Sequence, residues 1–310
     1  AQVPQLFRAL APRVLSALAV QLLLATFVGI AASLGPGSVT IWSYAFTLLQ
    51  LPIAMVPTAL ATAILPAASR LVAREDFAGL ATLARRSIGS VALALAPVAA
   101  IGGVLAPRAV GLVTGLGSAA PDIQRTGALL ALLLVGLGGY GATSILVRIF
   151  YSLDDTFNPT LAALVDVVVD VIVAVILVPL LGLAALAVAL SVGAWSEALF
   201  LSWRMRGRIA SLAPTRLFAL LLPTLLLSVP AAAVASAIAG IFDSIVRPTG
   251  ALGDLAVLVL AGGSGLLVYG AATVAAKRRE AAPLSALILR VAPAMRRIPG
   301  ISSLAATGDD

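Results

Sequence analysis

Two acidic residues stand four positions apart inside one of the most apolar stretches of the sequence. Asp166 and Asp170 occur in LVDVVVDVIVAV, and Glu197 follows in the next apolar stretch. Residues four apart share one face of a helix, and Asp170 would lie roughly 18 Å along a helix that starts near residue 158. That depth is close to the centre of a membrane, where an ionised carboxylate costs at least about 2.5–3.5 kcal/mol.

Three environments would tolerate this pair of aspartates. The pair could bind a cation or share a proton, because carboxylate oxygens are suitable ligands for a hard metal ion such as sodium. It could instead line a water-filled space without a specific ligand, or face lipid. We take Asp166 and Asp170 as a candidate sodium or proton site, and we expect no other cofactor.

Other polar side chains in the apolar stretches are candidates for lining a substrate path. They are Gln21, Tyr44, Thr47, Gln50 and Glu197. In membrane proteins such side chains more often hydrogen-bond a neighbouring helix, so both interpretations stay open. No Lys or Arg lies deep enough in these stretches to be an obvious salt-bridge partner for the three acids.

The composition excludes several classes of protein. Of 310 residues, 61% are hydrophobic and 11% charged, against roughly 25% charged in a soluble domain. The absence of Cys and His removes disulfides, zinc–thiolate sites, thiol catalysis and the commonest general base. We find no nucleophile–base arrangement and no phosphate-binding Gly-x-x-x-x-Gly-Lys-Ser/Thr loop. We therefore do not expect an enzyme, and any transport would draw on an ion gradient or the membrane potential.

Eight stretches are long and apolar enough to cross a membrane as helices of about 20 residues. They lie roughly at 12–34, 38–72, 84–105, 124–148, 158–180, 182–203, 216–240 and 251–276. The second contains Pro52, Pro57 and Pro66, and because proline removes a helical hydrogen bond, we expect a kinked or broken helix there. Glycines such as Gly136, Gly138, Gly139 and Gly141 permit close helix packing, although glycine is frequent in membrane helices anyway.

The positive charges sort onto one side of these spans. Alternate connections and the two ends carry 17 of the 20 Lys and Arg residues, and the other connections carry 3. Positively charged loops stay in the cytoplasm, so we expect both ends of the chain to be cytoplasmic. The net charge of +7 then favours anionic lipid headgroups as partners over nucleic acid.

The two ends of the chain give further expectations. Residues 281–299 are too short and too charged to span, so they form either an amphipathic helix on the cytoplasmic leaflet or a frayed tail. The first residue is Ala1, and no signal-peptide pattern precedes the first span. We expect the chain to be a piece of a longer protein.

Three stretches resemble the MurJ (MviN) lipid II flippases of the multidrug/oligosaccharidyl-lipid/polysaccharide exporter (MOP) superfamily. The first carries Tyr44, Ala45, Pro52, Thr62, Pro66, Ser69 and Arg70 of a Tyr-Ala…Pro…Thr-x-x-x-Pro-x-x-Ser-basic pattern. The second, FYSLDDTFNPT, carries Phe150, Tyr151, Asp155, Thr156 and Pro159 of a Phe-Tyr-x-x-x-Asp-Thr-x-x-Pro loop. The third is the pair of spans that ends in SWRMRGR. The likeness covers about residues 5–276.

The resemblance implies an all-α bundle from the bacterial cytoplasmic membrane. Family members have fourteen helices in two lobes, and they flip a lipid-linked peptidoglycan precursor, lipid II, by alternating access. The eight spans would be the last eight: a six-helix second lobe (1–210), two further helices that form a lipid-tail groove (211–280) and a cytoplasmic tail (281–310). The implied partners are the lipid-linked oligosaccharide, membrane lipids and the missing N-terminal lobe.

Two departures from the family pattern keep other functions open. The family's cavity-facing Asp-Arg pair is replaced by Phe46 and Thr47, and threonine cannot hold a pyrophosphate as a bidentate arginine would. Some members bind sodium through acids that include one in the first helix, where this sequence has Phe27. The alternatives are an exporter of another polysaccharide lipid or of a cationic small molecule, and a non-transporting scaffold or degenerate half-transporter.

Overall fold

The computed structural model describes residues 3–115, 122–245 and 250–276. These residues are almost entirely helical and contain no strand, so the predicted all-α fold is confirmed. The helices are α1 (Val3–Ser33), α2 (Ser38–Met55), α3 (Pro57–Ala73), α4 (Phe77–Gly115), α5 (Ile123–Leu134), α6 (Leu137–Ser152), α7 (Phe157–Leu181), α8 (Ala184–Met205), the short 3₁₀ helix η1 (Ala210–Leu212), α9 (Pro214–Ile245) and α10 (Gly250–Ala275). The predicted cytoplasmic tail, 281–310, lies outside the described residues.

The described helices match the predicted spans in order. Six of them, α2, α4, α7, α8, α9 and α10, are long and apolar enough to cross a membrane. The pair α5 and α6 makes a seventh if its 40° bend lies within one span. The remaining predicted span corresponds to α1, in which Ala17–Ser33 forms a shorter apolar stretch.

The predicted break in the second span is present. The segment forms two helices, α2 and α3, that meet at Val56. Pro52 lies within α2, and Pro57 is the first residue of α3, a position where a helix needs no backbone N–H. The Val56 N–H still donates to the carbonyl of Pro52, over 3.2 Å, so the break leaves the end of α2 hydrogen-bonded.

A second break was not predicted. The sequence pattern indicated one continuous span over 124–148, but α5 ends at Leu134 and α6 begins at Leu137. Two carbonyls at this break accept hydrogen bonds from α8: Ser191 Oγ donates to Leu132 O over 2.8 Å, and Trp195 Nε1 donates to Val135 O over 3.0 Å. Backbone groups inside a membrane must find hydrogen-bond partners within the protein, and Ser191 and Trp195 supply donors to the carbonyls at this break.

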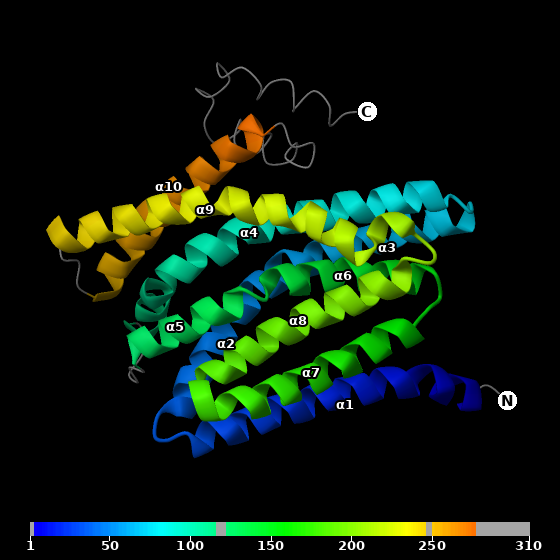
Figure 1. Cartoon of the computed structure of the whole chain (residues 1–310), viewed down its shortest axis with the longest axis horizontal. Coiled ribbons are helices and arrows are strands. Elements are labelled where there is room, and N and C mark those ends of the chain that lie inside the picture. Colours follow the sequence, from blue (N-terminus) through cyan, green and yellow to red (C-terminus); the bar gives the residue numbers. More distant parts are fainter. Residues whose placement is uncertain (1–2, 116–121, 246–249, 277–310) are drawn as a thin grey trace.

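The helices pack in two connected groups (Figure 1). In one, α7 lies between α1 and α8, while α8 also packs on α5 and α6. In the other, α9 packs along both α4 and α10. The long helix α4 contacts both groups, so it joins the α9–α10 hairpin to the rest of the bundle.

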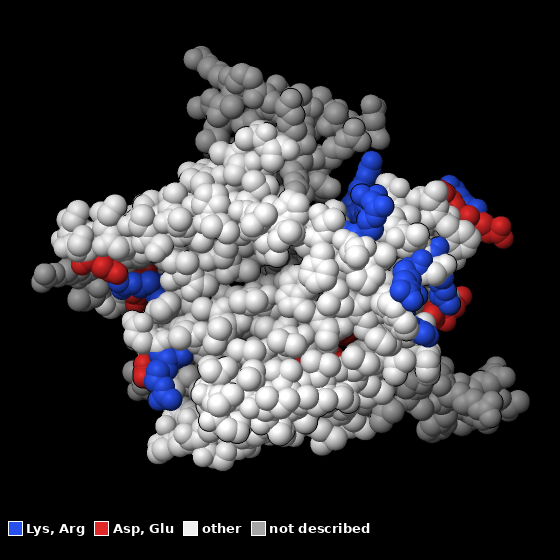
Figure 2. All heavy atoms as spheres, viewed as in Figure 1, with Lys and Arg blue, Asp and Glu red and all other residues white. Residues whose placement is uncertain are grey.

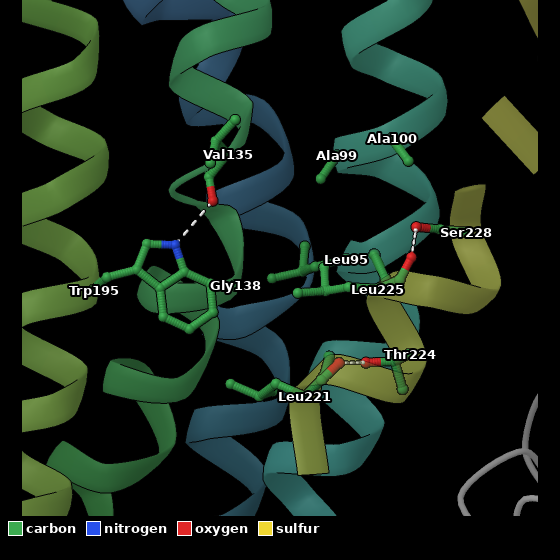
Figure 3. A pocket seen from close by; sticks show the side chains of 12 residues that line it. Leu95, Ala99, Ala100, Val135, Gly138, Trp195, Leu221, Thr224, Leu225 and Ser228 are labelled. Carbon is green, nitrogen blue, oxygen red and sulfur yellow. Dashed lines mark hydrogen bonds between the residues drawn. The ribbon is translucent and has the colours of Figure 1, made fainter. Parts of the chain in front are cut away.

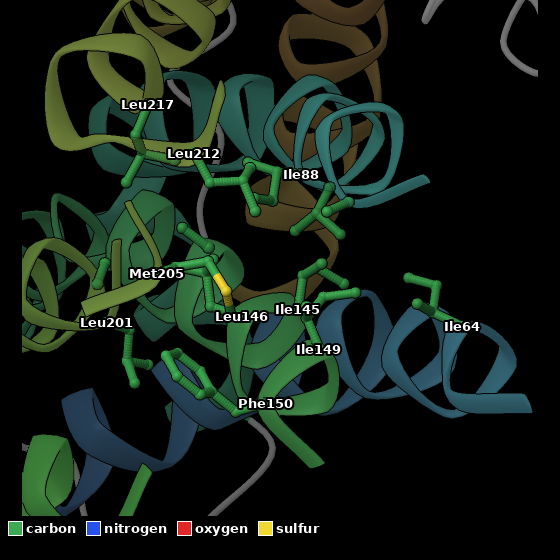
Figure 4. Packing of buried hydrophobic residues seen from close by; sticks show 14 of the residues in the cluster. Ile64, Ile88, Ile145, Leu146, Ile149, Phe150, Leu201, Met205, Leu212 and Leu217 are labelled. Atoms are coloured by element: carbon green, nitrogen blue, oxygen red, sulfur yellow. The ribbon is translucent and has the colours of Figure 1, made fainter. Parts of the chain in front are cut away.

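Buried apolar side chains fill the junction of α3, α4, α6, α8 and the start of α9. Figure 4 shows this cluster, in which Ile145, Ile149 and Phe150 of α6 lie close to Leu201 and Met205 of α8. A second cluster joins α1, α2, α5, α7 and α8, and a third joins α4, α9 and α10. The bundle therefore has apolar packing along its whole width.

The outer surface matches a lipid environment. Large apolar side chains stay exposed along the spans, including Leu22, Val175, Val229 and Leu252. Figure 2 shows an almost uncharged middle, with Lys, Arg, Asp and Glu gathered towards two opposite ends. This pattern is typical of a multi-pass membrane protein. Which end faces the cytoplasm stays a prediction from the charge sorting.

Candidate functional site

The two aspartates of α7 point into the bundle. Asp170 is fully buried, and it lies in a stripe with Ala162, Asp166 and Ala174 at intervals of four residues. The opposite face of α7 carries exposed apolar side chains such as Val171 and Ile172. Because α7 turns this acidic stripe towards its neighbours, Asp170 does not face lipid.

Both carboxylates converge on one glycine of α8. A Cβ atom built on Gly193 would lie 2.0 Å from Asp170 Oδ1 and 2.6 Å from Asp166 Oδ1. No side chain fits at that distance without displacing the carboxylates, so Gly193 supplies the space they occupy. The spacing of the aspartates was readable in the sequence, whereas the role of Gly193 was not, because α8 is rich in small residues.

Glu197 follows Gly193 by one helical turn and adds a third acid to this region. Its carboxyl interacts electrostatically with both aspartates, and the phenol of Tyr140 on α6 interacts electrostatically with all three acids. Tyr140 donates a long hydrogen bond of 3.4 Å to the carbonyl of Leu190. The structure therefore brings Asp166, Asp170 and Glu197 together from two helices.

The acids lack counter-charges within the described part of the chain. No salt bridge recorded there reaches Asp166, Asp170 or Glu197. Both carboxylate oxygens of Asp170 are buried without a hydrogen-bond partner. A buried charge of this kind is costly unless it is neutralised or paired, which makes Asp170 the strongest candidate among the three acids for a proton or cation site. The described residues form no group of three or more acids arranged to hold a metal ion, so a cation would need further ligands, such as backbone oxygen or water.

The first helix offers an aromatic side chain in this part of the bundle. Phe27 is fully buried and meets Trp42 of α2 edge to face, with ring centroids 5.7 Å apart. Trp42 in turn stacks on Phe46, at 5.6 Å. These three rings join α1 to α2, and they occupy two of the positions at which the sequence departs from the pattern of the family it resembles.

The remaining predicted lining residues do not gather around the acids. Thr47 and Gln50 share the exposed face of α2, opposite its buried Trp42 and Leu49, and Tyr44 is half-buried. Gln21 is exposed on α1. Of the five predicted lining residues, the structure brings only Glu197 to the aspartates.

A cavity that the sequence did not reveal lies between α4, α8, α9 and the α5–α6 break (Figure 3). Its volume is about 250 Å³. Its walls are largely apolar and include Leu95, Trp195, Leu221 and Leu225. Gly138, one of the glycines at 136–141, leaves room for the Trp195 ring that forms part of this wall.

An ion pair fastens the last two helices. Arg108 donates to Asp254 of α10 over 2.8 Å and also pairs with Asp243 of α9. The sequence placed Arg108 in a loop after a span ending near 105, but α4 continues to Gly115. The loop assignment was wrong because the ion pair and the packing on α9 and α10 extend the helix past its apolar run.

The FYSLDDTFNPT loop has a structural explanation of its own. Asp155 accepts hydrogen bonds from the backbone and side chain of Asn158, over 3.1 and 2.6 Å, and forms an ion pair with Arg208. Asn158 in turn accepts from Arg204 Nε over 2.6 Å. This network ties the α6–α7 connection to the end of α8.

Comparison with known proteins decides the family. The family described as "Lipid II flippase MurJ" matches residues 1–261. The chain belongs to the MurJ lipid II flippase family. The helical fold and the apolar outer surface are consistent with this membership.

The individual proteins that resemble this chain share 29% or less of its aligned residues. The "Probable lipid II flippase MurJ" of Rhizobium meliloti (strain 1021) is 29% identical over 171 residues, covering 55% of this chain and 32% of that protein. The structure of "Lipid II flippase MurJ, inward closed conformation" aligns with a TM-score of 0.67 at 16% identity, covering 87% of this chain and 54% of that one. This chain thus spans a third to a half of the length of these two relatives.

A further solved structure shares the fold. It is a MOP superfamily transporter from Pyrococcus furiosus, for which a reversed polarity of the binding pocket is said to suggest a different function. The TM-score is 0.52 at 15% identity, and the alignment covers 95% of this chain and 74% of that protein. This likeness shows a shared helical fold.

Proposed function

We propose that this chain forms the second-lobe part of a transporter that moves lipid II across the bacterial cytoplasmic membrane. The match of residues 1–261 to the flippase family carries this proposal. Alternating access needs a second bundle against which this one moves. We therefore propose an N-terminal lobe as the partner, and a cytoplasmic location for both ends of this chain.

We further propose that Asp166 and Asp170 couple transport to a sodium ion or a proton. The supporting observation is Asp170, which is fully buried at the α7–α8 contact with neither carboxylate oxygen hydrogen-bonded. Binding of a cation or proton would neutralise this group, and its release would favour a different packing of α7 against α8. The chain would thus gain two states that differ in occupancy of the site.

Complementation of a flippase-depleted bacterium tests this function. The protein that contains this chain should restore growth, and the Asp170→Asn variant should not. Asp154→Asn, a change at an exposed position after α6, should restore growth like the parent and serves as the matched control. Growth that does not depend on Asp170 would remove the coupling proposal, and failure of the parent to restore growth would remove the lipid II proposal.

A specific observation favours a second candidate, the export of a cationic small molecule. Three acids gather between α7 and α8 without a recorded salt bridge in the described residues, and Thr47 stands where a family arginine would hold pyrophosphate. Cells that express the protein would then accumulate less of a fluorescent cationic dye. Unchanged accumulation alongside restored growth would exclude this candidate.

A further inference from the structure

One arginine of α6 lies inside the bundle without a recorded acidic partner. The sequence placed Arg148 at the end of a span, but α6 continues to Ser152, so Arg148 lies one helical turn inside the helix. Its Nε atom is buried without a hydrogen-bond partner, and no salt bridge recorded among the described residues reaches it. A buried N–H without an acceptor costs free energy, so this guanidinium would gain from an added acceptor.

Burial separates Arg148 from the other arginines. Among the arginines whose exposure the structure describes, only Arg108 and Arg148 are not exposed. Arg108 is already paired with Asp243 and Asp254. Within this described set, Arg148 therefore combines shelter from solvent with the lack of a carboxylate partner.

Helix α6 lies in the interior of the bundle. None of its residues, Leu137–Ser152, is exposed. The helix packs on α3, α4 and α8, and Figure 1 shows it between α4 and α8. Its apolar side chains, such as Ile145 and Ile149, enter the cluster shown in Figure 4. A ligand of Arg148 must therefore lie among the helices, whereas phospholipid at the outer surface meets the exposed arginines.

The side of α6 that carries Arg148 is polar. Polar side chains recur there at intervals of four, four and three residues, and all are half-buried: Tyr140, Ser144, Arg148 and Tyr151. This spacing places them on one face of the helix. The guanidinium carbon of Arg148 lies 6.0 Å from the centroid of the Tyr151 ring, while Tyr140 interacts electrostatically with the three acids. The polar face thus runs from the acids towards the end of α6 that the charge sorting places in the cytoplasm.

The chemistry of Arg148 suits a phosphate group. The N–H donors of a guanidinium form a planar fork that binds two phosphate oxygens at once. A phosphate oxygen beside Nε would supply the acceptor that this atom lacks. Tyr140 is eight residues from Arg148, roughly 12 Å along the helix at about 1.5 Å per residue, so a phosphate held at Arg148 stays apart from the three acids.

We propose that Arg148 binds the pyrophosphate of a lipid-linked substrate that enters the bundle from the cytoplasmic side. The substrate class rests on the proposed function, and the residue rests on the burial and pairing described above. Arg148 then supplies from α6 a cation that α2 does not offer at Thr47. The polar face of α6 is the part of this chain along which the head group enters.

Calorimetric binding to the purified protein that contains this chain tests the proposal. The probe is farnesyl diphosphate, a prenyl diphosphate without a sugar, and farnesol is its uncharged counterpart. Arg148→Gln should weaken diphosphate binding by about tenfold to a hundredfold, the range for hydrogen bonds to a charged group, and should leave farnesol binding unchanged. Arg148→Lys keeps the charge but loses the fork, so its affinity should lie between those of Arg148→Gln and the parent.

A matched control separates this site from general attraction to positive charge. Arg206 is exposed at the end of α8, with its guanidinium carbon 5.0 Å from the Trp203 ring centroid, so Arg206→Gln should bind the diphosphate like the parent. Equal losses in Arg206→Gln and Arg148→Gln would overturn the proposal. An equal loss of binding to phosphatidylglycerol in Arg148→Gln would also overturn it, because Arg148 would then be a contact for phospholipid head groups.

Two further outcomes are decisive. Unchanged diphosphate affinity in Arg148→Gln would overturn the proposal, and if that variant does not fold, unchanged affinity in Arg148→Lys would do the same. Binding is measured without transport, so its failure is distinct from that of the proposed function. A parent that restores growth while Arg148→Gln binds normally removes this inference alone. A parent that binds the diphosphate through Arg148 but does not restore growth counts against transport of lipid II and leaves the phosphate site in place.

Discussion

Two groups of acidic residues in this protein differ in whether a basic side chain pairs with them. Asp243 and Asp254, towards one end of the bundle, share Arg108 of α4. Asp166 and Asp170, within an apolar span, have no recorded partner of this kind among the described residues. Each group has a glycine against it: Gly111 lies near Asp254, and Gly193 near Asp170. The local space is therefore similar, and the difference lies in the counter-charge.

We expect this difference to separate a structural ion pair from a proposed binding site. An ion pair that is complete within the fold holds helices together and gains nothing from an added ion. A buried carboxylate without a counter-charge is costly, so Asp170 is the candidate for binding a proton or cation. The comparison predicts that changes at the Arg108 group alter stability, whereas changes at Asp170 alter function.

The largest effect should follow Asp170→Asn. The substitution keeps the size of the side chain and removes the group that binds a cation or proton. Transport by the protein that contains this chain should fall by about tenfold or more, on the order of 1.4 kcal/mol or greater. A transport assay beside thermal unfolding measures both outcomes. Two results would contradict the comparison. One is unchanged transport, and the other is a loss of transport that is fully explained by unfolding of the variant.

Gly193→Ala should give the next largest effect. The added methyl group would lie 2.0 Å from Asp170 Oδ1, so α7 and α8 must separate at a cost of about 1–3 kcal/mol. Denaturation of the purified protein measures this cost. Gly240→Ala in α9, where nothing lies within 4 Å of the new atom, is the matched control and should be neutral or stabilising by up to about 1 kcal/mol. Equal stability of the two variants would contradict the close approach.

Arg108→Gln should lower stability with a smaller effect on transport. It leaves Asp254, whose side chain is only 15% exposed, without its charged partner, and the loss should be about 1–2 kcal/mol because the arginine is partly solvated. Unfolding measurements give the loss, and proteolysis after α9 shows whether the α9–α10 hairpin loosens first. Loss of transport with unchanged stability would place Arg108 in the binding machinery instead.

Arg125→Gln should have the smallest effect and calibrates the others. Its pair with Asp122 is long, at 4.0 Å, and both side chains are about half exposed. Such surface pairs contribute about 0–1 kcal/mol. A change in unfolding free energy as large as that of Arg108→Gln would show that end-of-helix charges act generally, and not through the particular geometry of Arg108.

The sequence predicted those features that depend on local spacing. Prolines 52 and 57 broke the second span where expected, since proline disrupts a helix by itself. The interval between Asp166 and Asp170 placed both on one face of α7, and the structure turns that face inward. Alternation of charged connections with apolar stretches gave the order of the helices.

Features that depend on distant residues could not be read this way. The α5–α6 break is stabilised by Ser191 and Trp195, more than fifty residues further along the chain. Arg108 pairs with residues 135 and 146 positions away. Its helix therefore continues beyond residue 105, where the end of the apolar stretch had suggested a loop. Gly193 is one small residue among many in α8, and only the packing of α7 against it shows why it is glycine.

The most direct test of the central claim is thermal unfolding of the purified chain across a grid of sodium concentration and pH. A ligand that binds only the folded state stabilises it by RT ln(1 + [L]/Kd), about 2.7 kcal/mol at 100 Kd. The account predicts that the melting temperature of the parent changes along the sodium axis or the pH axis, and that Asp170→Asn removes that change while Asp122→Asn keeps it. The same response in the parent and in Asp170→Asn would contradict it.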